Sequence, residues 1–72
     1  TKRHAFAAAF DFTAREAEVL DGILRGLELE AIGVKLGISD RTVKYHINGL
    51  LKKTGMANRQ RLLHFYTGWQ AG

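Results

Sequence analysis

The stretch that most constrains this chain covers residues 37–51 and reads G-I-S-D-R-T-V-K-Y-H-I-N-G-L-L. It opens with a turn glycine, and Ser39 is typical of a helix N-cap. Apolar residues then recur every three or four positions, which predicts a helix over about residues 39–54. They share one face of that helix and are Val43, Ile47, Leu50 and, beside them, Leu51 and Thr54. This face is expected to pack against the rest of the chain.

The opposite face of the same helix carries long hydrogen-bond donors, an aromatic ring and no acidic side chain. Its members are Arg41, Lys44, Tyr45, Asn48 and Lys52. Lysine and arginine donate to phosphates and to guanine, and asparagine pairs with adenine, so this combination favours a DNA groove. The alternatives are a plainly solvated basic surface and, for the tyrosine ring, packing against the domain.

Composition limits the fold and the setting. Seventy-two residues allow one domain, and the lack of cysteine excludes disulfides and thiolate metal sites. The absence of proline agrees with an all-α chain. No apolar run reaches the ~18 residues of a membrane span, so we expect a cytoplasmic protein with no membrane partner. The start at Thr1 suggests processing or a domain from a longer chain.

Charge is unevenly distributed along the sequence. Residues 1–40 contain five Lys or Arg and all seven Asp and Glu, whereas residues 41–72 contain six Lys or Arg and no acid. The second part therefore has a net charge of +6 against −2 for the first. Such asymmetry indicates that the C-terminal part faces a polyanion.

The remaining periodicity predicts a compact four-helix domain over residues 12–70, which contains a helix-turn-helix, after an N-terminal tail or linker at residues 1–11. Phe6 and Phe10 are spaced as on one helix face, so the alternative for this tail is a short helix that docks both rings. Thr13 and Glu16 form a capping-box pattern that begins the first firm helix, and Gly26 ends it. The other helices are expected from residue 28 or 29 to 36, over 39–54, and from 59 to about 69.

The segment from residue 29 onward has the spacing of a helix-turn-helix. A small residue, Gly33, stands at its fifth place and a glycine, Gly37, at its ninth. Two helices that cross steeply need a small contact residue and a tight corner, which explains both. Apolar residues occupy the buried positions, namely Ile32, Leu36, Ile38 and Val43.

These residues carry a family resemblance. The stretch F-T-A-R-E-A-E-V-L, followed by T-V-K-Y-H, K-K-T-G and N-R in that order, resembles the LuxR/NarL-type DNA-binding domain of bacterial transcription regulators over about residues 12–67. The resemblance implies a response-regulator output domain whose third helix enters the major groove of double-stranded DNA. It also implies a homodimer on inverted repeats, joined through the fourth helix, and a receiver or sensor domain before this one.

The resemblance assigns roles residue by residue. Base contacts are expected from Lys44, Tyr45 and Asn48, with Arg41 as a further candidate. Phosphate contacts are expected from Thr42, His46 and Lys52. Apart from the resemblance, the charge of Lys35, Lys53, Arg59 and Arg61 suits them to hold the DNA backbone, with plain solvation as the alternative for Lys53, Arg59 and Arg61. The apolar fourth helix is either all core or meets a partner subunit along one edge, through Leu62, Leu63, Tyr66 and Trp69.

Two acids depart from the family pattern. Glu28 stands where a Ser or Thr cap is usual, and Glu30 stands where a phosphate-binding Lys is common. Both suit the helix dipole but repel phosphate, so we expect weaker DNA anchoring by the second helix. They also favour the alternative function, a helix-turn-helix fold used for protein interaction or dimerisation without DNA.

An enzyme is not expected, because no nucleophile–base pair or glycine-rich phosphate loop stands out. The three histidines, His4, His46 and His64, lack the spacing of metal ligands. We therefore expect no catalytic residue, no metal and no cofactor. For His46, partial burial in a structural role is an alternative to a phosphate contact.

Overall fold

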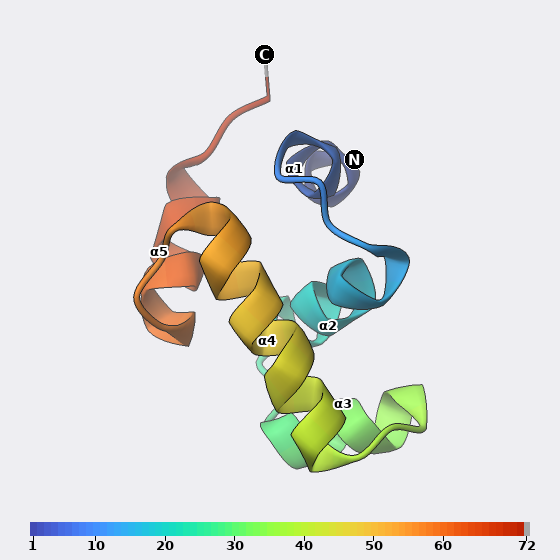
Figure 1. Ribbon diagram of the computed structural model, residues 1–72. Coiled ribbons are helices and arrows are strands. Elements are labelled where there is room, and N and C mark those ends of the chain that lie inside the picture. The colour runs from blue at the N-terminus through green and yellow to red at the C-terminus, as the bar shows by residue number, and fades with distance from the viewer. Residues whose placement is uncertain (72) are drawn as a thin grey trace.

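The computed structural model describes residues 1–71, which form five α-helices and no strand (Figure 1). This confirms the all-α fold class. The four expected helices are present with one more in front of them. The helices are α1 (Lys2–Ala9), α2 (Ala14–Leu24), α3 (Leu29–Leu36), α4 (Asp40–Thr54) and α5 (Arg59–Gly68).

The helix ends follow the capping signals in the sequence. At the start of α2 the amide of Glu16 donates to the Thr13 hydroxyl at 3.1 Å, and the amide of Thr13 donates to the Glu16 carboxylate at 2.9 Å. The side chains of Ser39 and Asn58 accept amides in the first turns of α4 and α5. Each of these bonds satisfies a donor that a helix start leaves open.

The corner between α3 and α4 depends on two glycines. Gly37 ends α3 with a φ of 69°, in the left-handed region that glycine adopts without strain. Gly33 lies where the two helices cross, and a Cβ added there would stand 2.7 Å from the carbonyl oxygen of Ile38. The backbones therefore approach closely, as the helix-turn-helix spacing predicts.

The core forms around α4, which runs through the middle of the molecule and packs against α2, α3 and α5 (Figure 1). The buried face of α4 is the predicted one. The buried apolar side chains are Phe6, Val19, Leu20, Ile23, Ile32, Val43, Ile47, Leu50 and Leu62. The opposite face of α4 is left open.

Residues 1–11 are for the most part helical and belong to this core. Phe6 of α1 is completely buried, and its ring centroid lies within 6 Å of five other aromatic rings. These rings belong to Phe10, Phe12, Phe65, Tyr66 and Trp69. Of the two alternatives for the N-terminal segment, the structure has the docked helix.

Candidate nucleic-acid interface

The open face of α4 gathers the side chains that the sequence singled out. Arg41, Lys44, Tyr45, Asn48 and Lys52 are all exposed, while Val43, Ile47 and Leu50 on the other side are buried. Tyr45 is 73% exposed, so its ring does not pack into the domain. Within residues 1–71 no ion pair involves the three cations of this face. They are free to meet an external anion.

A hollow lies beside this face, between α4 and the start of α2. From α4 it is lined by Tyr45, His46, Gly49, Lys52 and Lys53, and from the start of α2 by Thr13 and Glu16. His46 is half-buried at its edge, and its ring makes an edge contact with Tyr45 at 5.4 Å. The hollow extends from the open face of α4 to the start of α2.

The ammonium group of Lys53 is bound to two other segments of the protein. Its Nζ donates to Glu16 Oε1 at 2.6 Å and to the carbonyl oxygen of Asp11 at 2.9 Å. It thus ties α4 both to the capping box of α2 and to the connection that leads from α1. From the sequence, Lys53 was expected to contact phosphate. Its carboxylate partner could not be foreseen, because Glu16 lies 37 positions away along the chain.

The pKa of Glu16 reflects these contacts. Burial by itself raises the pKa of this carboxyl. The hydrogen bonds from Lys53 and Thr13, together with the charge of Lys53, outweigh burial and hold the pKa below its ordinary value. Glu16 is therefore ionised at neutral pH and cancels the charge of Lys53 next to the open face of α4.

The position of the Glu16 side chain explains why residue 49 is a glycine. It is a helix-interior glycine on no apolar stripe, and a Cβ at this position would overlap Oε2 of Glu16. The missing side chain leaves room for the buried carboxylate. The sequence offered no signal for this, because the glycine and the glutamate belong to different helices.

Three other candidates for phosphate contact also have partners within the protein. Arg59 donates through Nη2 to the Leu27 carbonyl at 2.7 Å. The hydroxyl of Thr42 lies 3.0 Å from that of Ser39. Lys35 leans towards Asp21, with 3.9 Å between Nζ and Oδ2. Lys52, in contrast, has no ion-pair partner among residues 1–71.

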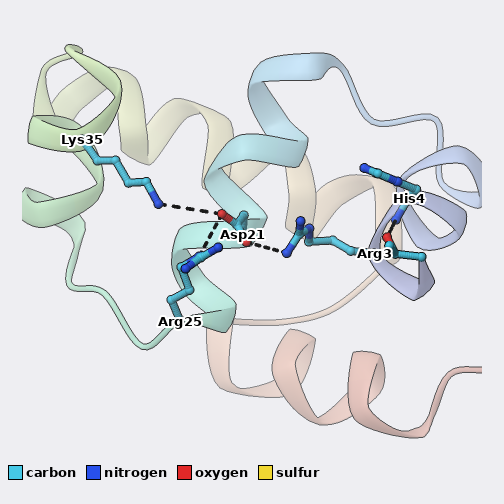
Figure 2. Close-up of polar contacts among 6 residues, drawn as sticks. Arg3, His4, Asp21, Arg25 and Lys35 are labelled. Atoms are coloured by element: carbon cyan, nitrogen blue, oxygen red, sulfur yellow. Dashed lines mark hydrogen bonds and ion pairs between the residues drawn. The ribbon is translucent and has the colours of Figure 1, made fainter.

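Asp21 of α2 contacts cations from α1, from α3 and from the residue that follows its own helix (Figure 2). Arg3 of α1 contacts Oδ1 at 2.6 Å, and Arg25, which follows α2, contacts Oδ2 at 3.0 Å. With Lys35 of α3, one carboxylate thus joins the first three helices. The sequence did not single out Asp21, since its partners are brought together only by the fold.

Acidic side chains border the other end of the open face. Glu28, Glu30 and Asp40 line a shallow hollow together with Leu29 and Lys44. Glu28 is the N-cap of α3 but makes no side-chain capping bond. The surface around α4 is therefore acidic near the start of the helix and basic near its end.

The residues expected at a dimer contact differ in exposure. Leu62 is completely buried in the core, so its side chain has no surface to offer a partner. Leu63, Tyr66 and Trp69 are half-buried. Tyr66 and Trp69 pack edge-on against Phe6, with ring centroids 4.9 and 5.1 Å away.

Residues 1–71 contain neither a metal-ligand cluster nor a membrane-spanning helix. Within residues 1–71 no group of three or more His, Cys, Asp or Glu side chains is arranged to hold a metal ion. None of the helices in the same range is both long and apolar enough to span a bilayer.

Known proteins similar to this chain are bacterial regulatory proteins. Residues 11–66 match the family described as bacterial regulatory proteins, luxR family. The transcriptional regulatory protein UhpA of Salmonella typhimurium is 36% identical over 58 residues, which cover 79% of this chain and 30% of UhpA. The uncharacterized transcriptional regulatory protein YxjL of Bacillus subtilis is 40% identical over 62 residues, which cover 86% of this chain and 28% of YxjL.

A third relative carries a more specific name. The response regulator Rre1 of Synechocystis is 40% identical over 55 residues, 76% of this chain and 24% of Rre1. The chain thus spans less than a third of the length of these relatives. No solved structure matches it.

Proposed function

Because this chain belongs to the LuxR family of bacterial regulatory proteins, we propose that it is a transcription-regulator domain that binds double-stranded DNA in a sequence-specific manner, with α4 in the major groove. The observation that carries the proposal is the open face of α4. It carries an exposed tyrosine, an asparagine, no acid, and three cations that have no ion-pair partner among residues 1–71. The major groove of B-DNA admits one α-helix of this kind.

The base contacts are proposed from the middle of this face. Lys44 donates to guanine O6 or N7, and Asn48 pairs with adenine N6 and N7. Tyr45 offers its ring to a thymine methyl group, and Arg41 reaches the edge of the groove. The side chains that bear on the DNA backbone are proposed to be Lys52, His46 and Thr42.

The remaining basic candidates are proposed in a lesser role. Lys53 and Arg59 already donate short hydrogen bonds, to Glu16 and to the Leu27 carbonyl, and Lys35 lies 3.9 Å from Asp21. Exchanging a short hydrogen bond within the protein for one to phosphate gains little binding free energy, because the bond that is broken is worth about as much as the bond that forms. Lys52 is therefore the principal phosphate contact near the end of α4.

The proposal extends to the assembled regulator. Two copies bind inverted half-sites as a homodimer, which meets through Leu63 and Tyr66 of α5 and through Trp69 directly after it. Since the relatives are longer than this chain, a receiver or sensor domain precedes the domain in the whole protein, which acts in the cytoplasm. The alternative function, a protein-interaction module without DNA binding, draws on the acids Glu28, Glu30 and Asp40 beside α4.

In vitro selection from a random duplex library tests the proposal and yields the site. With the selected duplex, Lys44→Ala is expected to lose about 1–3 kcal/mol of binding free energy and to relax preference at one base pair. Lys52→Ala is expected to weaken all sequences alike, because a phosphate contact reads no base.

Arg25→Ala is the control for the loss of one positive charge, because this side chain is bound to Asp21 and not to the α4 face. It should bind like the parent chain. If no sequence is enriched from the library, the DNA-binding proposal fails and the interaction-module alternative takes its place.

A further inference from the structure

The start of α4 borders an acidic hollow. Three carboxylates line this hollow, from Glu28 and Glu30 at the start of α3 and from Asp40 in the first turn of α4, together with Leu29 and Lys44. Helix α3 packs beside the first turns of α4, so both helices contribute to one surface (Figure 1). Lys44, which is proposed to contact a base, therefore has three acids around it.

The three carboxylates of the acidic hollow are not neutralised by cations of the protein. Glu28, Glu30 and Asp40 are exposed, and no ion pair within residues 1–71 involves any of them. The acids of α2 are instead all paired with Lys or Arg, and they are Glu16, Glu18 and Asp21. The acidic hollow therefore repels a nearby anion more strongly than the paired acids of α2 do.

Lys44 lies one helical turn after Asp40 but is not bound to it. Side chains four positions apart lie on the same side of a helix. Lys44 nevertheless takes part in no ion pair within residues 1–71. Its side chain is exposed, so the ammonium group can turn to an acceptor on DNA while the acids remain close by.

The two kinds of acceptor that DNA offers to Lys44 respond differently to these acids. A phosphate carries a full negative charge, whereas guanine O6 and N7 are neutral acceptors in the major groove. Carboxylates near Lys44 repel the phosphate as a like charge and act only weakly on the neutral base edge. The surroundings of Lys44 thus favour a base contact over a phosphate contact.

We infer that Glu28, Glu30 and Asp40 are specificity determinants, which keep phosphate away from the start of α4 and so leave Lys44 to the bases. This inference rests on the proposed DNA binding with Lys44 as a base contact. On a duplex that lacks the right base pair, Lys44 can recover binding only from phosphate, the acceptor that supplies non-specific affinity. The acids disfavour this second contact, and the difference in affinity between right and wrong sequences widens.

Anisotropy titrations with the selected duplex and with a scrambled duplex of the same composition test the inference. The variant Glu28→Gln/Glu30→Gln removes two negative charges at nearly constant side-chain size. It is expected to bind the scrambled duplex about three- to tenfold tighter and the selected duplex less than about twofold tighter. For the scrambled duplex, the slope of log K against log salt concentration should steepen by up to about 0.9, because Lys44 gains a phosphate.

Two comparisons separate this effect from a general change of charge. Asp11→Asn/Glu18→Gln removes the same charge from two exposed acids outside the acidic hollow, and it should change the affinity for both duplexes by the same factor. In a Lys44→Ala background, Glu28→Gln/Glu30→Gln should also act on both duplexes alike. No ammonium group is then left at position 44 to move from base to phosphate, so the coupling between the acids and Lys44 is measured as a double-mutant cycle.

The ratio of affinities for the selected and scrambled duplexes decides the outcome. The inference is overturned if this ratio is the same in the parent chain and in Glu28→Gln/Glu30→Gln, or if it falls as much in the control or in the Lys44→Ala background. Weaker binding of the selected duplex by Glu28→Gln/Glu30→Gln would also overturn it, since a glutamate would then accept from a base such as cytosine. A parent chain that binds no duplex refutes the proposed function, whereas one that binds the selected duplex with a ratio indifferent to these acids refutes only this inference.

Discussion

At the scale of single residues, the close approach at Gly33 accounts for the geometry of the helix-turn-helix. A side chain there would meet the Ile38 carbonyl and the Val43 methyls. We expect Gly33→Val to lower the free energy of unfolding by about 1–3 kcal/mol, because the backbones must move apart. Urea denaturation measures this. Ala31→Val is the control on the exposed face of the same helix, and it should cost only the small difference in helix propensity.

Glu16 gives stability a defined dependence on pH. The pKa of Glu16 in the folded protein lies below its ordinary value. Its contribution to the free energy of unfolding is therefore complete at pH values above the ordinary carboxyl pKa, and it disappears as the pH falls through the pKa of the folded state. Glu16→Gln should cost about 1–2 kcal/mol at neutral pH, since Lys53 loses its charged partner. The difference between variant and parent should shrink on acidification through that window.

The control for this measurement is Glu18→Gln. Glu18 is an exposed acid of the same helix, paired with Arg15 at 3.7 Å. It should change stability little at any pH, because exposed ion pairs contribute little. A gap between Glu16→Gln and the parent that stays constant from neutral to acid pH would exclude the role assigned to the carboxylate.

At the scale of helices, α1 acts as part of the core. Phe6 is completely buried among aromatic rings, so Phe6→Ala should lower the free energy of unfolding by about 3–5 kcal/mol, through lost burial and the cavity left behind. Thermal or chemical denaturation gives the value. His4→Ala alters an exposed side chain of the same helix and should be close to neutral. Equal effects of the two variants would mean that α1 is not docked in solution.

The helices also differ in how far sequence could define them. Helices α2 to α5 begin at polar caps and end at or near glycines, and their apolar spacing points to one core, so local signals were enough. The state of α1 was left open between tail and docked helix, because the rings that hold Phe6 on α5 lie some 60 positions away. Long-range packing decided this element.

The same distinction applies to the candidate site. Which α4 side chains face outward followed from helical periodicity alone, and the structure places all five on the open face. The sequence could not show which basic side chains lack a partner within the protein. Lys53 and Arg59 donate to Glu16 and to the Leu27 carbonyl, which belong to distant segments of the chain. For Leu62 the sequence left open whether the side chain packs in the core or meets a partner subunit. The structure buries it in the core.

At the scale of the whole molecule, the charges form a direction along α4. Acids from α3 and the first turn of α4 border the start of this helix, and near its end the exposed Lys52 lies beside a Glu16 carboxylate that is already bound to Lys53. On DNA this arrangement favours phosphate contact towards the end of α4 and disfavours it towards α3. The molecule thus presents one face of α4 to the proposed DNA groove. Helix α1 and the aromatic rings around Phe6 lie at the end of the molecule away from α3 (Figure 1).

The central claim is that this surface binds duplex DNA through its cations, and a fluorescence anisotropy titration across salt concentrations tests it most directly. Each phosphate neutralised contributes about −0.9 to the slope of log K against log salt concentration. Lys52, as the principal phosphate contact, predicts a slope of about −0.9 or steeper for each bound copy, and a shallower one for Lys52→Ala. Affinity for duplex that does not fall as salt rises, or no binding at low salt, would contradict the account.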